Sequence, residues 1–401
     1  MKKISGIVLS ASFLFLSFNC KVQTLSSHDK KEPSTFFKHI VDSGSSRGVT
    51  VEETVDGGYV LTGYSTGGTH GNEDLLVIKT SLKGESIWKK YIGGKGEDYG
   101  WAIRQTDGSG FIVVGYTTSF GNGGMDIYLT RLNAIGDTLW TKTYGGEGDE
   151  YGWDVRNTKD KGFIIAAQTN SAGNGAIDAY LIKTDKDGNE EWSKTYGGAM
   201  IDRIFSVQQT QDGGYISTGI TYSFDSINSE DRDGYLLKTD SLGNEEWYKI
   251  IGANSYDVCH SISLTQDGGY FITGYGESFA TSGNRDVYLI KTDAQGNTDW
   301  LKAYGGIGEE RGIKGYQTKD GGYIAIGYTS SNRDMYLLRT NNSGDTLWTR
   351  SFGNPDDVDF GYTVRETIDN GFILLGHSNQ LNDQMTHILL IKTDGEGFVN
   401  D

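Results

Sequence analysis

One unit of about 50 residues repeats along most of this 401-residue chain, and the repeat limits the possible folds more than any other feature. A tryptophan marks six copies, and successive tryptophans lie 52, 52, 55, 53 and 48 residues apart. They are Trp88, Trp140, Trp192, Trp247, Trp300 and Trp348. A Lys or Arg lies nine residues before each one, and Lys392 marks a seventh copy that ends before its tryptophan. Repeats of this length are typical of arrays in which each unit packs on its neighbours.

Each copy has the pattern of four short strands, and the second copy serves as the type. The predicted strands are 100–106, 111–116, 126–132 and 138–144. The turn Asp107-Gly108-Ser109-Gly110 separates the first two, because Asp-Gly pairs favour hairpin turns. The chain holds 58 Gly and only 2 Pro, which suits many strands joined by tight turns.

The two ends of the repeat region complement each other. The last copy supplies three strands, and the N-terminal segment 36–40 aligns without gaps on 88–92, the fourth strand of the first copy. Pairing the two ends would close a ring and remove two exposed sheet edges. We therefore predict an all-β fold, a single seven-bladed β-propeller of four-stranded antiparallel blades, closed by the N-terminal strand in the C-terminal blade.

The repeat resembles the bacterial seven-bladed β-propeller repeat family (SBBP type) over nearly all of residues 36–398. The resemblance rests on Asp126-Ile127-Tyr128-Leu129, Trp140, Tyr144-Gly145-Gly146 and Asp160-Lys161-Gly162-Phe163. It implies the propeller fold and an exported or surface location, and it brings no catalytic motif. Two positions depart from the pattern: Phe36 replaces the tryptophan, and His387 replaces the aspartate that begins the third strand.

The first 20 residues have the pattern of a bacterial lipoprotein signal peptide. Lys2 and Lys3 precede the apolar stretch 4–18, which is shorter than a membrane span and ends just before Cys20. The segment resembles a lipobox, so we predict that Cys20 is lipidated; an ordinary cleaved signal peptide is the alternative. Residues 21–34 are polar and predict a flexible tether. The propeller would then occupy residues 35–401.

Charge limits the partners of the mature protein. Removal of residues 1–19, with two Lys and no acidic residue, changes the net charge from −17 to −19. Such a body repels nucleic acid and anionic membrane surfaces, so we expect neither as a partner. Membrane contact would come through the lipid anchor alone. We expect an exported monomer anchored in the cell envelope, at the outer membrane, on its periplasmic or surface face.

Two sets of charged residues are candidates for a binding site at one mouth of the propeller channel. The carboxylates precede the first strand of successive blades and are Asp98, Glu150, Asp202, Asp257, Glu310 and Asp359. The arginines lie further along that strand and are Arg104, Arg156 and Arg365. The carboxylates would form a negative funnel for a cation, a basic peptide or Ca²⁺, with the arginines lining a polar channel. Alternatively, these groups are solvated loop charges and structural ion pairs.

A third set alternates with the arginines: Val49, Trp101, Trp153, Phe205, His260, Ile313 and Tyr362. We interpret this set as packing between blades. No two histidines have metal-ligand spacing on one element, and apart from Ca²⁺ no cofactor is expected.

The sequence favours a non-enzymatic envelope lipoprotein whose propeller binds or scaffolds a protein or glycan. Two alternatives stay open: a hydrolase or lyase acting on polysaccharide or peptide through the mouth carboxylates, and a structural envelope component. A carboxylate with a strongly raised pKa in a concave pocket would favour the enzyme. An aromatic patch at one face would favour the binding protein.

Overall fold

The computed structural model describes residues 35–224, 232–253, 255–280, 284–330, 333–353, 357–380 and 385–400. The predicted signal peptide 1–20, the lipidation site Cys20 and the tether 21–34 lie outside these ranges. Residues 35–400 belong to one compact unit, which begins at Pro33. No helix in the described part of the chain is long and apolar enough to cross a membrane.

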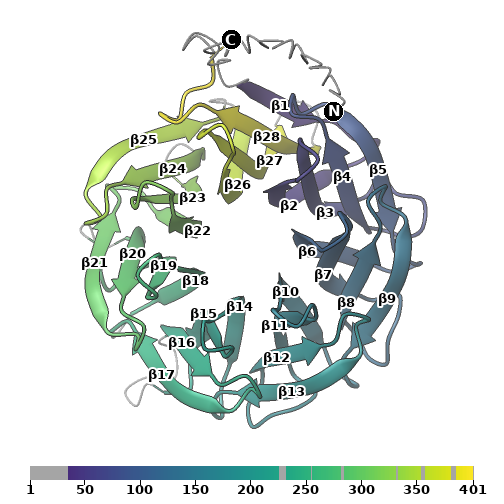
Figure 1. Cartoon of the computed structure of the whole chain (residues 1–401), viewed down its shortest axis with the longest axis horizontal. Helices are drawn as coiled ribbons and strands as arrows, with labels where there is room; N and C mark the ends of the chain where they lie inside the picture. Colours follow the sequence, from purple (N-terminus) through teal and green to yellow (C-terminus); the bar gives the residue numbers. More distant parts are fainter. Residues whose placement is uncertain are drawn as a thin grey trace, which may run out of the picture. The chain divides into compact units, whose positions relative to one another are not determined.

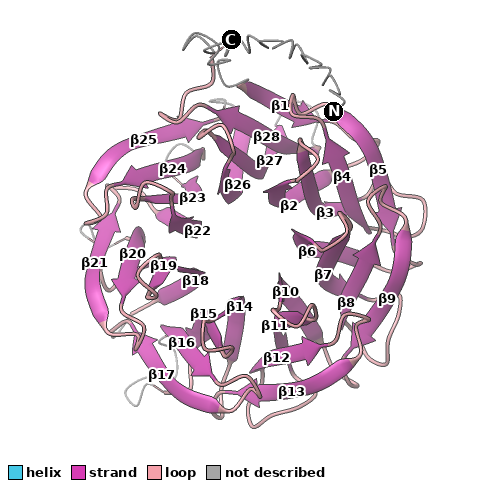
Figure 2. Ribbon diagram, in the orientation of Figure 1, coloured by secondary structure: helices cyan, strands magenta, loops and turns pink. Residues whose placement is uncertain are grey.

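The described residues form 28 strands in seven four-stranded antiparallel sheets, which are arranged as a ring (Figures 1 and 2). Blade one is β2 (Ser46–Glu53), β3 (Tyr59–Ser65), β4 (Asp74–Thr80) and β5 (Ser86–Ile92). Blade two is β6 (Asp98–Gln105), β7 (Phe111–Thr117), β8 (Asp126–Leu132) and β9 (Thr138–Tyr144). Blade three is β10 (Glu150–Asn157), β11 (Phe163–Thr169), β12 (Asp178–Thr184) and β13 (Glu190–Tyr196).

The other four blades repeat this plan. Blade four is β14 (Asp202–Gln209), β15 (Tyr215–Thr221), β16 (Asp233–Thr239) and β17 (Glu245–Ile251). Blade five is β18 (Asp257–Leu264), β19 (Tyr270–Gly276), β20 (Asp286–Thr292) and β21 (Thr298–Tyr304). Blade six is β22 (Glu310–Gln317), β23 (Tyr323–Thr329), β24 (Met335–Thr340) and β25 (Thr346–Phe352). Blade seven is β26 (Asp357–Glu366), β27 (Phe372–Gln380), β28 (Thr386–Thr393) and β1 (Phe36–Ile40).

The predicted fold is confirmed, including the closure of the ring. β1 pairs with β28 in antiparallel register, from Phe36 opposite Lys392 to Ile40 opposite Ile388. In blade two the third and fourth strands have the predicted bounds, and the second is one residue longer. The first strand begins two residues early, because Asp98 and Tyr99 pair with Thr117 and Tyr116.

Each tryptophan of the repeat packs on a glycine in the next blade. A Cβ atom placed on Gly136 would lie 2.7 Å from the ring of Trp88, and one on Gly296 would lie 2.6 Å from that of Trp247. At the closure, Phe36 takes the place of a tryptophan and contacts Gly84 in the same way. Since strands two and three of each blade are buried on both faces, this contact helps one blade cover the next.

This packing predicts unequal costs for two glycine substitutions in blade five. Gly296 and Gly268 both have positive φ, 73° and 86°, but only Gly296 is in contact with an aromatic ring. Gly268→Ala should cost about 1–2 kcal/mol for the left-handed backbone alone. Gly296→Ala should cost about 1–3 kcal/mol more, because its methyl group overlaps Trp247. Denaturant unfolding of both variants measures the difference, and equal costs would show that the tryptophan contact is not tight.

A binding site in the central channel

Every innermost strand carries a β-bulge at the same position. In β6 the register shifts between Gly100 and Ala102, so Trp101 is the extra residue, and the shift recurs in the other six blades. A bulge bends the strand and re-aims the side chain of the extra residue. The seven bulge residues are Val49, Trp101, Trp153, Phe205, His260, Ile313 and Tyr362.

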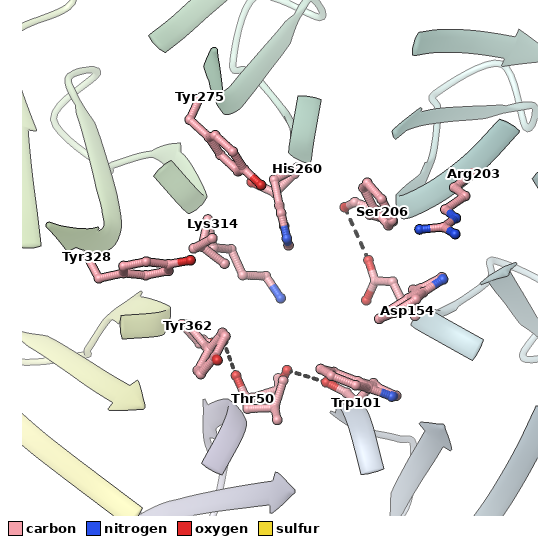
Figure 3. A pocket seen from close by; sticks show the side chains of 16 residues that line it. Thr50, Trp101, Asp154, Arg203, Ser206, His260, Tyr275, Lys314, Tyr328 and Tyr362 are labelled. Carbon is pink, nitrogen blue, oxygen red and sulfur yellow. Dashed lines mark hydrogen bonds between the residues drawn. The ribbon is translucent and has the colours of Figure 1, made fainter. Parts of the chain in front are cut away.

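All seven bulge residues line one cavity of about 340 Å³ in the channel (Figure 3). The other lining residues are Thr50, Asp154, Arg203, Ser206, Ser261, Tyr275, Lys314, Tyr328 and Thr363. The predicted packing between blades is present too, since the rings of Trp101 and Trp153 lie 5.0 Å apart. The interpretation as packing alone was incomplete, because the bulge also presents these side chains to the cavity.

Aromatic rings form continuous chains of contact around this cavity. Trp153 contacts Phe205 edge to face at 5.6 Å between centroids, and Phe205 stacks on His260 at 5.3 Å. At the side nearer the start of the innermost strands, Tyr99 stacks on Tyr116 at 4.5 Å. Such rings offer broad apolar faces with polar edges, a lining typical of small-molecule sites.

Arginine side chains lie among the tyrosines at this end of the channel. Arg311 lies 5.3 Å from the centroid of the Tyr275 ring, and Arg203 lines the cavity itself. The Nε atom of Arg203 is buried and has no hydrogen-bond partner among the described residues. Arg311, by contrast, forms an ion pair with Glu309 at 2.7 Å. Arg203 therefore lines the cavity and keeps a guanidinium nitrogen that has no hydrogen-bond partner in the described part of the chain.

Asp154 is the one carboxylate among the described residues that line the cavity. Two arginines that lie outside the cavity lining form ion pairs with it. Its Oδ1 lies 2.6 Å from Nη2 of Arg104, and its Oδ2 lies 3.2 Å from Nε of Arg156. Ser206 also donates a hydrogen bond to Asp154, at 3.3 Å. Burial would favour the neutral acid, but Arg156 and Arg104 outweigh it and lower the pKa of Asp154 to about 2.

Lys314 and His260 supply the other titratable groups of the cavity. The Lys314 ammonium points into the cavity, and neither a hydrogen bond nor an ion pair links it to the described residues (Figure 3). Burial first, and Arg104 second, lower the pKa of Lys314 well below its usual range. Burial and then Lys314 lower the pKa of His260 to about 4, so its imidazole is neutral near pH 7.

The six predicted mouth carboxylates lie elsewhere: each is at most 7% exposed and none lines the cavity. Asp98 accepts hydrogen bonds from the Thr117 hydroxyl and from the Gly94 N–H, the latter at 2.8 Å. Glu150 and Asp202 are held in the same way in their own blades. In this position they fix the connection between one blade and the next. Burial raises the pKa of Asp257 to about 6. Ligand binding by these carboxylates stays a prediction.

The three predicted arginines lie close to one another and outside the lining of the cavity. Arg104 is 4% exposed, and its Nε lies 3.4 Å from Glu52 in addition to its bond with Asp154. Arg365 lies 5.7 Å from the centroid of the Tyr316 ring, and its pKa is lowered by burial first and by Arg104 second. These contacts support the structural ion pairs that the sequence left open, with Asp154 and Glu52 as the acidic partners.

Sequence reasoning missed Asp154, Lys314 and Arg203, although for Asp154 and Lys314 the repeat contained a signal. At the position after the bulge the other five blades carry small residues, Thr50, Ala102, Ser206, Ser261 and Thr363. Only Asp154 and Lys314 break that pattern, so a comparison of the copies at this single position would have singled them out. Within the described ranges, no group of three or more His, Cys, Asp or Glu side chains is arranged to hold a metal ion.

The comparisons with known proteins support the propeller fold alone. No family model and no curated protein matches the sequence. Among solved structures, the polysaccharide lyase Uly1 is similar with a TM-score of 0.55 and 8% identity, over 93% of this chain and 94% of that one. A puromycin hydrolase gives 0.50 and 12%, over 86% and 53%. A Bacteroides caccae protein of unknown function gives 0.45 and 10%, over 77% and 94%.

The network around Asp154 predicts a large loss of stability when its charge is removed. Asp154→Asn keeps the shape but leaves Arg104 and Arg156 buried without their shared counter-ion, which should cost about 3–5 kcal/mol. Asp107→Asn is the control, because the Asp107 side chain is 84% exposed, and it should change stability by less than about 0.5 kcal/mol. Urea unfolding compares the two, and a small effect of Asp154→Asn would show that water or another group already neutralises the arginines.

Proposed function

We propose that this protein is a non-enzymatic, lipid-anchored envelope protein whose propeller binds a glycan in the central channel. The observation that carries the proposal is the ring of seven bulge residues around one cavity, five of them with aromatic or imidazole rings. Sugar rings present flat apolar faces edged by hydroxyl groups, and aromatic side chains with a few polar groups suit that surface. The volume, about 340 Å³, suits one or a few sugar rings better than a folded protein partner.

The chemistry of the cavity supports binding over hydrolysis. A glycoside hydrolase needs two carboxyl groups about 5–10 Å apart, one of them with a raised pKa. Among the described residues Asp154 is the sole carboxylate that lines the cavity, and its pKa is lowered, to about 2, by its arginine partners. A carboxylate held ionised in this way is a poor proton donor. Its two arginine bonds give it a supporting role in the cavity floor.

Replacement of a cavity tryptophan should weaken saccharide binding. Trp153→Ala removes one of the aromatic side chains that surround the cavity. It should raise the Kd for a bound oligosaccharide by at least about tenfold. Tyr248→Ala is the matched control, because Tyr248 is an exposed aromatic residue on the outer strand β17. Isothermal titration against a panel of neutral and acidic oligosaccharides provides the measurement.

Two results would count against this proposal. Equal affinities of Trp153→Ala and the control would place the saccharide outside the channel. Shortened oligosaccharides after long incubation, seen by chromatography, would replace the binding protein with an enzyme. Intact oligosaccharides and a selective loss in Trp153→Ala are the expected outcome.

Lipid attachment at Cys20 has its own test. The basic residues Lys2 and Lys3, the apolar stretch 4–18 and the cysteine that follows support it. In a bacterial host, the wild-type protein should partition into detergent and carry acyl chains on Cys20 by mass spectrometry, whereas Cys20→Ser should carry none. Acyl-free protein in the wild type would favour an ordinary cleaved signal peptide.

A further inference from the structure

A cluster of charged side chains at and next to the cavity has more basic than acidic groups. The cationic groups are Arg104, Arg156, Lys314 and Arg365, and the anionic groups are Asp154 and Glu52. These six groups influence one another's ionisation, so they form one electrostatic cluster inside the channel. Buried charges are stable when each has a counter-ion, and here cations outnumber acids by two.

The two acidic groups already form ion pairs with arginines of the cluster. Asp154 bonds Arg104 at 2.6 Å and Arg156 at 3.2 Å, and the nearest cation to Glu52 is Arg104 at 3.4 Å. No ion pair within 4.0 Å connects the Lys314 ammonium to a described acid. Lys314 is therefore the cation of the cluster that faces the open cavity without a partner of its own (Figure 3).

We propose that Lys314 binds the anionic group of an acidic saccharide, a uronic acid carboxylate or a sulfate ester, whose sugar ring lies against the aromatic residues. This inference rests on the proposed glycan-binding function and names the class of its ligand. Lys314 and the bulge residues Trp153 and Tyr362 line the same cavity, so one sugar residue can meet both kinds of surface. Arg203, whose Nε has no hydrogen-bond partner among the described residues, offers a second cation in the lining of the same cavity.

The lowered pKa of Lys314 agrees with its position as a buried amine that has no ion-pair partner among the described residues. Burial opposes the charged ammonium, and the nearby guanidinium groups of Arg104, Arg365 and Arg156 add repulsion that Asp154 only partly offsets. His260, on the neighbouring strand β18, is neutral near pH 7 and contributes no charge there. An oxyanion close to Lys314 would supply the missing negative charge and stabilise the protonated amine.

A pair of ligands that differ only in charge tests the proposal. The probes are a short oligogalacturonate and its methyl ester, titrated into wild-type protein at constant ionic strength, with a sulfated disaccharide in a separate arm. We expect the wild type to bind an acidic probe at least about tenfold more tightly than the ester. Comparing the carboxylate and sulfate arms identifies which anion the site prefers.

Three variants assign that preference to the lysine. Lys314→Met should bind the acid and the ester with equal affinity, and Lys314→Arg should restore part of the difference. Lys302→Met is the control, because Lys302 lies on the outer strand β21 and pairs with Asp345 at the surface. Thermal unfolding shows that each variant is folded, and Lys314→Met should be at least as stable as the wild type because it removes a buried amine that has no ion-pair partner among the described residues.

The outcomes separate this inference from the proposed function. If Lys314→Met keeps the preference for the acid, the inference is overturned while glycan binding stands. If no saccharide binds but sodium sulfate raises the Tm of the wild type more than that of Lys314→Met, the anion site is real and the glycan function fails. If neither saccharide nor sulfate distinguishes the two proteins, both proposals fail.

Discussion

The contact between one blade's tryptophan and the next blade's glycine is the interaction on which the rest of this structure depends. A four-stranded sheet whose middle strands are apolar on both faces cannot remain exposed to water on either side. Trp88 on Gly136 and the equivalent pairs join each blade to the next, and the smaller Phe36 on Gly84 makes the same contact at the closure. The ring is complete when the first strand joins the last blade, because β1 covers the edge of β28 as the fourth strand covers the third in the other blades.

A rigid ring of equal blades allows a few positions in the channel to vary freely. The bulge in every innermost strand takes one residue out of the ladder and presents it to the channel, so its identity has little effect on the sheet itself. The residues that pack one blade on the next make the same contact in each blade, so their identities are constrained. The bulge residue and the residue after it lie at the central channel, where that constraint does not apply. Trp101 and Lys314 can therefore differ from their counterparts in the other blades, and the proposed binding site lies at such positions.

The sequence predicted the fold well because local patterns determine it. Strand three of blade two, Asp126–Leu132, and the closing segment Phe36–Ile40 were predicted with the observed bounds. The site was harder to predict because it depends on the bulge, which changes the direction of one side chain without a marker in the strand pattern. The carboxylate of Asp98 illustrates the same limit: its place before an apolar run predicted a loop charge, but hydrogen bonds from Thr117 and Gly94 draw it into a buried position.

The charge of the channel is opposite to that of the whole protein. The chain has a net charge of −17, yet the cluster around Lys314 has two more cationic than anionic groups. At physiological ionic strength the Debye length is about 8 Å, so the negative exterior hardly repels an acidic ligand until it is close. The charges of the cluster are buried, so screening between them is weaker and the local cations dominate. The acidic exterior would thus discourage nonspecific attachment of anions, and in the proposed site the buried cations would favour an acidic ligand where it also meets the aromatic rings of the cavity.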